Sequence, residues 1–147
     1  MEANTLDGQI PESLFQKYHV ALVKALGKDA EKVFVKLGRN LGSQIAKEGR
    51  ISLKELEEEL ADYLQNDLKL GEKIKVNIDN HTLNIEVEGC RICPANEILR
   101  SQGASGACFL PGILTGALKP IKEVKRATVV GAEKYEIGHC RMQLKLE

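Results

Sequence analysis

The chain contains no tryptophan and little aromatic surface of any kind. Phenylalanine and tyrosine occur three times each among its 147 residues. Aromatic side chains supply much of the bulk of cores and binding sites wherever they are present. Because they are scarce here, we expect any ligand pocket to be lined largely by aliphatic side chains.

The sequence also lacks an excess of either charge, a long apolar run and a secretory leader. Its 21 basic and 21 acidic residues cancel, whereas a basic excess is typical of nucleic-acid-binding and membrane-binding surfaces; a local basic patch is left open. No apolar run approaches the roughly 20 residues that span a bilayer. Residues 1–5 lack the basic and apolar segments of a leader. We therefore expect a cytoplasmic protein that neither spans a membrane nor binds nucleic acid directly.

Apolar residues in the first 70 positions recur three and four apart, which is typical of amphipathic helices. The predicted helices cover residues 11–26, 30–48 and 52–64. Gly27 is expected to end the first of them. Ser52, followed three positions later by Glu55, has the pattern of a capping box that begins the third.

From residue 73 the period changes to two, which is typical of strands with one buried face. We expect a hairpin of residues 73–78 and 83–88, and after it a short helical turn at 96–100, a helix over 107–118, and strands at 124–130 and 141–146 separated by a turn at Gly131. The predicted fold class is α+β, with N-terminal helices packed on a roughly four-stranded antiparallel sheet and a further helix between two hairpins. We expect residues 1–147 to form one domain.

All four cysteines lie in the last third of the chain. Cys90 and Cys93 form a Cys-x2-Cys pair, Cys108 opens a predicted helix, and Cys140 opens the last predicted strand. A structural zinc ion takes four ligands in a tetrahedron, commonly all thiolate, and cytoplasmic cysteine clusters more often bind metal than form disulfides. The spacing therefore predicts a metal site that uses at least three of these cysteines.

Three alternatives stay open for the cysteines. One or two of them can be small buried core residues, as unpaired cysteines often are. Cys90 and Cys93 can form a disulfide with each other. Four thiolates also hold iron–sulfur clusters, although this spacing matches none of the usual ferredoxin patterns.

His139 is a further candidate ligand because it precedes Cys140. Neighbouring residues of a regular strand point to opposite faces of the sheet, so at most one of this pair faces the metal. We favour Cys140. His19 and His81 stand alone in the sequence and are expected to be surface or packing residues.

Gly112 and Gly116 lie four apart in a predicted helix, and Gly38 and Gly42 have the same spacing in another. Such residues leave a flat strip along a helix. Either an apolar ligand or the backbone of a second helix can lie against that strip, and the spacing does not separate the two.

The residues from Cys108 to Leu118, followed by Glu133, Gly138 and Cys140 to Met142, together resemble the 4-vinyl-reductase-like domain. This small-molecule-binding or hydrocarbon-binding domain occurs in a bacteriochlorophyll biosynthesis protein, in phenol- and xylene-sensing transcription activators and in stand-alone archaeal proteins. Its fold is shared with subunits of a eukaryotic vesicle-tethering complex. The resemblance identifies this chain with the stand-alone archaeal type.

The resemblance implies a mixed α/β domain with an antiparallel sheet, often a homodimer, and a zinc site beside an apolar ligand pocket. Cys108 and Cys140 match the first and last metal ligands of that family, and Glu133 matches its glutamate ligand. The middle cysteine of the family pattern falls at Glu136, which is a departure.

The Cys-x2-Cys pair is expected to make up for the missing thiolate, and Cys93-Pro94 resembles a Cys-Pro that the family often has nearby. The preferred zinc ligands are Cys90, Cys93, Cys108 and Cys140, with Glu133 and His139 as secondary candidates. By the same resemblance, Gly112 and Gly116 belong to the helix beside the ligand pocket.

Two classes of function follow. The first is a binding module, a sensor or carrier that holds a small hydrophobic molecule and is stabilised by zinc. The second is a redox enzyme of the vinyl-reductase type, which depends on a metal or an iron–sulfur cluster. We favour the binding module, because the sequence contains no dinucleotide-binding glycine motif and no acid–base pair at diagnostic spacing.

Overall fold

The computed structural model describes residues 12–47, 52–79, 81–121, 124–136 and 138–147, without the side chains of residues 12, 46–47 and 133–136. Its helices are α2 (Glu12–Leu26), α3 (Ala30–Lys47), α4 (Leu53–Asp62), α5 (Ile92–Ser101) and α6 (Leu110–Leu118), with a 3-10 turn η1 (Gly27–Asp29) and a π-helical turn η2 (Tyr63–Asp67). Its strands are β1 (Lys73–Ile78), β2 (Thr82–Glu88), β3 (Ala127–Glu136) and β4 (His139–Leu146). None of the helices in the described ranges is long and apolar enough to cross a membrane.

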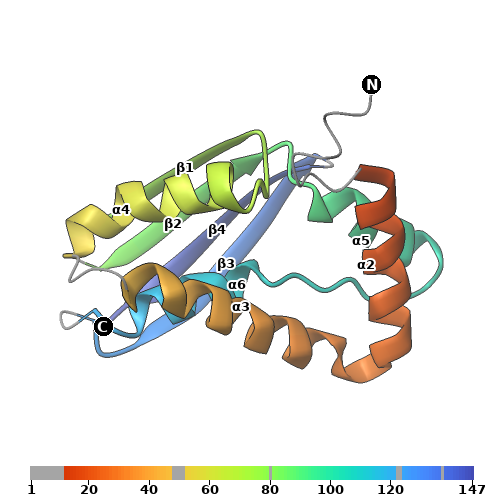
Figure 1. Ribbon diagram of the computed structural model, residues 1–147, viewed down its shortest axis with the longest axis horizontal. Coiled ribbons are helices and arrows are strands. Elements are labelled where there is room, and N and C mark those ends of the chain that lie inside the picture. The colour runs from red at the N-terminus through yellow and green to blue at the C-terminus, as the bar shows by residue number, and fades with distance from the viewer. Residues whose placement is uncertain (1–11, 48–51, 80, 122–123, 137) are drawn as a thin grey trace.

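The four strands form one antiparallel sheet in the order β1-β2-β4-β3. In the view of Figure 1, α4 runs in front of β1 and β2, α3 passes below α4, and α2 and α5 lie beyond the right-hand end of the sheet. The predicted α+β class and antiparallel sheet are confirmed. The N-cap half of the capping box is confirmed as well, since the Ser52 side chain accepts a hydrogen bond from the Glu55 N–H at 3.2 Å.

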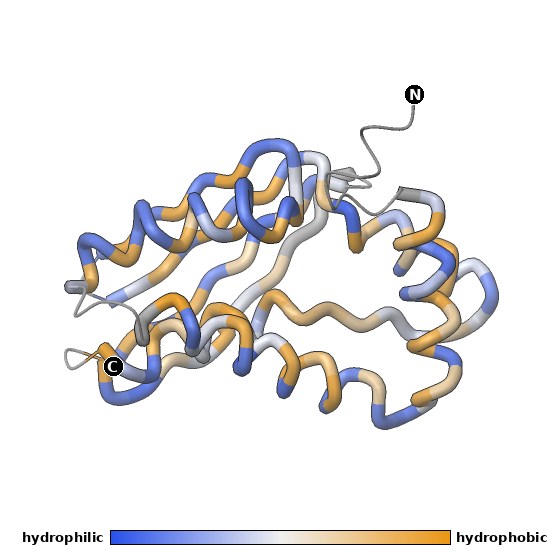
Figure 2. Tube along the Cα trace, viewed as in Figure 1, coloured by the Kyte–Doolittle hydropathy of each residue, from blue (hydrophilic) through white to orange (hydrophobic). Residues whose placement is uncertain are grey.

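The core lies between the helices and one face of the sheet. Along β2 the residues Leu83, Ile85 and Val87 are buried, while the residues between them are half-buried. The same alternation appears as orange and blue along the strands and helices in Figure 2. Buried leucines of α4 and η2 and apolar residues of α6 complete this core: Leu56, Leu60, Leu64, Ile113, Leu114 and Leu118.

Helices α3 and α6 cross with their backbones in contact, and glycines at the crossing allow this close approach. A Cβ atom at Gly38 would lie 2.1 Å from the carbonyl oxygen of Phe109, and one at Gly112 would lie 2.1 Å from that of Val35. Real Cβ atoms do not approach an oxygen so closely. Only glycine on both helices permits this contact.

After the first hairpin one predicted element is longer than expected and one turn was misplaced. The short helical turn predicted at 96–100 lies within the ten-residue helix α5, and the predicted helix at 107–118 contains α6. Gly131 lies inside β3, and the turn falls at Gly138, whose φ of 88° belongs to the left-handed region. A glycine in the sequence does not reveal its φ, which explains the misplaced turn.

Candidate functional site

The four cysteines come from four different places in the chain. Cys90 follows β2 and donates its N–H to the Gly138 carbonyl at 2.8 Å, which ties it to the turn before β4. Cys93 lies in the first turn of α5. Cys108 lies two residues before α6, and Cys140 is the second residue of β4.

The fold brings these thiols together. Cys90, Cys93 and Cys140 lie near enough for their side chains to shift one another's pKa. Cys108 lies close enough for its charge to interact with those of Cys90 and Cys93. None of the four is in a disulfide. We call these residues the cysteine cluster.

The environment of the cluster favours protonated thiols when no cation is present. Burial raises the pKa of Cys108 to about 12. Hydrogen bonds with Cys90 and Cys93, together with burial, raise the pKa of Cys140 well above its usual range. For Cys90 the hydrogen bond with Cys140 lowers the pKa, but the contact with Cys93 and burial outweigh it and raise the pKa. A thiolate is therefore unfavourable here unless a positive charge accompanies it.

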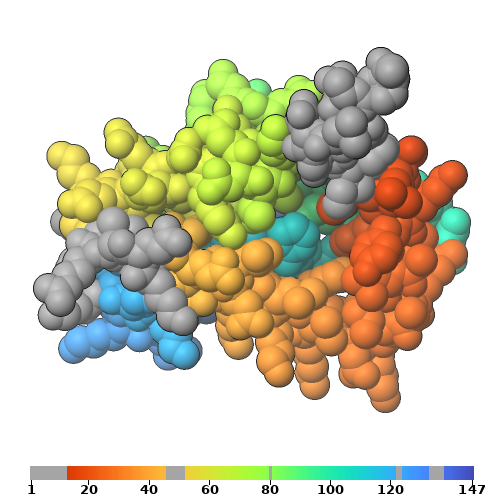
Figure 3. Space-filling model, viewed as in Figure 1, coloured from red at the N-terminus to blue at the C-terminus, as the bar shows by residue number. Residues whose placement is uncertain are grey.

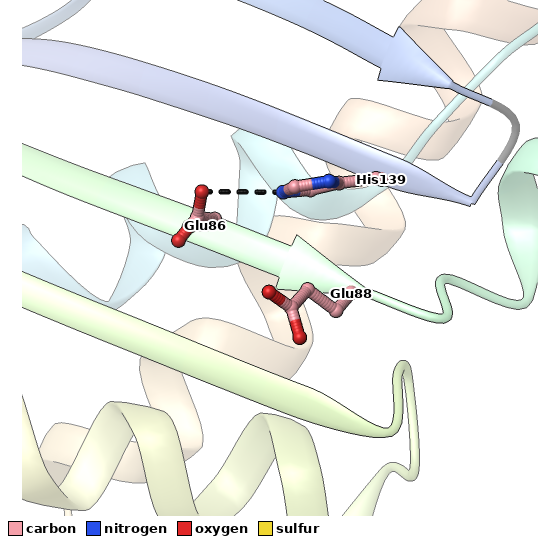
Figure 4. Close-up of side chains that lie close together, drawn as sticks. All are labelled: Glu86, Glu88 and His139. Carbon is pink, nitrogen blue, oxygen red and sulfur yellow. Dashed lines mark hydrogen bonds and ion pairs between the residues drawn. The ribbon is translucent and has the colours of Figure 1, made fainter.

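His139 points away from the cluster, on the outer face of the sheet. Its Nε2 lies 3.2 Å from Oε2 of Glu86, and Figure 4 shows Glu88 beside them on the same strand as Glu86. Ligand atoms of these three side chains lie within 4.8 Å of one another, as the ligands of a metal ion do.

A salt-bridge ladder accounts for this outer group without an ion. Arg141 lies 3.3 Å from Oε2 of Glu86, and the hydrogen bonds with His139 and Arg141 lower the pKa of that carboxyl group. On the neighbouring strand β1, Lys75 lies opposite Glu86 and Lys73 lies opposite Glu88.

The secondary candidate Glu133 lies on β3. Its backbone pairs with that of Arg141, and its side chain is outside the described part of the structure.

The glycine strip of α6 lies against α3. Gly112 faces the Val35 carbonyl and Gly116 faces the backbone of Arg39. Of the two alternatives for this strip, close packing between helices is the one seen in the structure. That Gly112 and Gly116 also border a ligand stays a prediction.

An apolar hollow of about 310 Å³ lies between α2, α3 and the segment before α6. In the space-filling view, teal atoms from the segment around residue 109 are visible between the red helix α2 and the orange helix α3 (Figure 3). The residues that line it are Phe15, Tyr18, His19, Leu22, Phe34, Leu37, Asn40, Leu41 and Phe109. All three phenylalanines of the chain gather at this one place, so the hollow differs from the largely aliphatic lining that we expected of a ligand pocket.

His19 sits at the inner wall of the hollow. The residue is 4% exposed, and its ring stacks on Phe34, with ring centroids 5.2 Å apart and planes 9° apart. Its Nε2 lies 3.0 Å from Oδ1 of Asn96 on α5. We expected a surface or packing role for His19; it packs, and it also lines a cavity.

The backbone of Ala107 determines how Asn96 and His19 share their hydrogen bonds. The Asn96 Nδ2 group donates to the Ala107 carbonyl and Oδ1 accepts from the Ala107 N–H, both at 3.0 Å. Oδ1 is thus an acceptor, so Nε2 of His19 carries the hydrogen. In the neutral ring Nδ1 is then an acceptor, and no hydrogen bond among the described residues uses it.

The hollow and the cysteine cluster share one segment of chain. Phe109 lines the hollow, and its neighbour Cys108 belongs to the cluster. Helix α5 carries both Cys93 and Asn96 within its first turns. Neither Asn96 nor His19 was predicted as a residue of the functional site. Their contact joins residues 77 positions apart, so it leaves no local pattern in the sequence.

Comparison with known proteins identifies the family. The family description that matches is "MJ0207 family", and the match covers residues 20–146. The chain belongs to the MJ0207 family. No curated protein matches this MJ0207-family chain.

Solved structures share the fold of this MJ0207-family chain. The phenol-responsive sensory domain of the transcription activator PoxR, solved with phenol, aligns with a TM-score of 0.59 at 16% identity and covers 93% of this chain and 75% of its own. A point mutant of the H-NOX protein of T. tengcongensis aligns with a TM-score of 0.56 at 12% identity, covering 95% and 74%. A Cs H-NOX mutant that carries the unnatural amino acid 4-cyano-L-phenylalanine gives the same values. At these identities the likeness establishes a common fold.

Proposed function

We propose that this protein is a small-molecule sensor or carrier module, in which the apolar hollow holds the ligand and the cysteine cluster holds zinc. The observation that carries the proposal is the hollow itself, because a chain with only three phenylalanines places all of them around it. A volume of about 310 Å³ lies in the range of small-ligand sites. The fold shared with the phenol-responsive sensory domain of PoxR supports the same assignment.

The chemistry of the lining suggests the class of ligand. The walls are aromatic and aliphatic, and Nδ1 of His19 offers one hydrogen-bond acceptor. A ligand that covers this nitrogen has to donate a hydrogen bond to it, since burying the acceptor unpaired would cost free energy. The ligand is a compact hydrophobic molecule, preferably a flat one, with a single hydroxyl or other donor group.

The donors of the cysteine cluster fit zinc. Four thiols converge from the β2–α5 junction, the segment before α6 and β4. When bound, zinc supplies the positive charge that stabilises the thiolates and joins these elements at one point. Cys90, Cys93, Cys108 and Cys140 would hold it, while His139 is turned to the other face. A site closed by four protein ligands stabilises the fold and leaves no position for a reacting water.

Metal analysis tests the zinc assignment. We expect about one zinc per chain and no visible absorption in the purified protein, whereas iron with visible colour would favour the redox alternative. Cys140→Ser should lower zinc content and melting temperature together, because metal binding contributes to folding free energy. His139→Gln is the matched control on the adjacent residue and should keep its zinc. Equal loss in both variants, or no metal in the wild type, contradicts the assignment.

Ligand titration tests the hollow. Phenol and toluene are suitable probes, because they differ only in the donor group, and binding can be followed by protein NMR shifts. We expect both to perturb residues of the hollow and phenol to bind more tightly. Leu37→Trp should abolish both shifts by filling the hollow, whereas Leu14→Trp, on another exposed leucine that does not line it, should not. Binding that survives Leu37→Trp places the ligand elsewhere.

A further inference from the structure

A second and larger cavity lies on the far side of the α3–α6 crossing. It has a volume of about 550 Å³ and is bounded by α3, the end of α6 and the segment that leads into β3. Its floor includes the buried side chains of Leu118 and Val124. Neither the cysteine cluster nor the apolar hollow contributes to it, apart from Asn40 at the shared wall on α3.

Cations dominate the lining of this cavity. The basic residues are Lys36, Arg39, Lys119, Lys125 and Arg126, and no acidic side chain is among the lining residues that the structure describes. The whole chain carries equal numbers of acids and bases, so this is a marked separation of charge. None of the five has an ion pair with any residue that the structure describes. We call this surface the basic cavity.

The arrangement of the basic cavity comes from a helix face and a connecting segment. Lys36, Arg39 and Ser43 recur three and four apart on α3, so they lie on one side of that helix. Lys125 and Arg126 face them from the chain before β3, which the backbone hydrogen bonds of both residues to the Glu147 carbonyl hold in place at 2.6 and 3.0 Å. Two separate elements thus present charge of one sign to the same space.

We propose that the basic cavity binds a small phosphorylated molecule that carries at least two negative charges. A cleft lined by one sign of charge above an apolar floor concentrates the electric field and attracts the opposite charge. Arginine and lysine donate several hydrogen bonds to phosphate oxygens, and Asn40 supplies a neutral donor nearby.

A compact anion suits the cavity better than a nucleic acid strand. None of the described residues that line it is aromatic, so these residues offer no platform on which a base can stack. The five cations line one cavity of about 550 Å³, which is the size of a small-molecule site. The apolar floor accepts the uncharged part of a small ligand.

Titration with inorganic pyrophosphate by calorimetry, at low ionic strength, tests the proposal. We expect saturable binding with one site per chain that weakens as salt is added. The double variant Lys36→Gln with Arg39→Gln should weaken binding at least about tenfold, because it removes two of the charged donors. The control is Lys24→Gln with Lys32→Gln, which removes two exposed lysines of α2 and α3 outside the cavity.

The outcomes separate the alternatives. Weaker pyrophosphate binding in the Lys36→Gln, Arg39→Gln variant alone supports the proposal. Phenol binding in the apolar hollow should be unchanged in that variant. Absence of saturable binding, or an equal loss in both double variants, overturns it, because a diffuse field then explains the effect. Tighter binding of a single-stranded oligonucleotide through Lys36 and Arg39 would also overturn it and make the cavity a nucleic-acid surface.

Discussion

Asn96 connects three parts of the molecule through one buried amide. It is 6% exposed, and it bonds His19 of α2 and both backbone groups of Ala107. These contacts fix the segment that carries Cys108 into the cluster and Phe109 into the hollow. A substitution of Asn96 is therefore expected to alter both the cysteine cluster and the apolar hollow.

Asn96→Ala should lower the free energy of unfolding by about 1–3 kcal/mol, since it leaves buried backbone and imidazole groups without partners. It should also weaken phenol binding, because the His19 ring and Phe109 lose their common support. Chemical denaturation and NMR titration measure the two effects. Asn77→Ala, on an exposed asparagine of β1, is the control and should change stability by less than about 0.5 kcal/mol. Wild-type stability in Asn96→Ala would show that the network contributes nothing.

At the level of elements, patterns that depend on neighbouring residues predicted the structure well. The helices up to Leu64, the capping box at Ser52 and the first hairpin follow from local spacing of apolar residues. The hairpin register, with Val76 opposite Ile85, follows because one face must be buried. The hollow was not predictable, because its residues come from distant segments and its composition is set by how α2 meets α3.

The glycine crossing offers a test at the same level. Gly112→Ala should destabilise the protein by about 1–3 kcal/mol, because the added methyl group would force α3 away from α6. The gain in helix propensity from alanine, about 1 kcal/mol, works in the opposite direction and does not remove the clash. Thermal and chemical denaturation give the difference. Gly131→Ala is the matched control, since nothing lies within 4 Å of its Cβ position; similar stability of both variants would contradict close packing at the crossing.

For the whole molecule, the two edges of the sheet differ in how they are covered. On β1 the N–H groups of Ile74 and Ile78 donate to side chains of Gln65 and Glu57, at 3.1 and 2.9 Å. That edge is thereby occupied by α4 and η2. On β3 the residues from Thr128 to Ala132 are all exposed and uncharged. Exposed edges of this kind pair readily with another strand.

The resemblance to a family of often dimeric domains led us to expect a homodimer. We predict that the two copies contact each other through β3. Two copies of an antiparallel edge strand can pair with each other about a two-fold axis, and Val129 and Val130, 39% and 54% exposed, would become buried. Val130→Lys should convert the dimer to a monomer without unfolding it, because charge on an edge strand opposes pairing. Light scattering after size-exclusion chromatography gives the mass. Asn77→Lys places the same charge on the covered β1 edge and should leave the dimer intact, so a dimer that persists in Val130→Lys would exclude β3 as the interface.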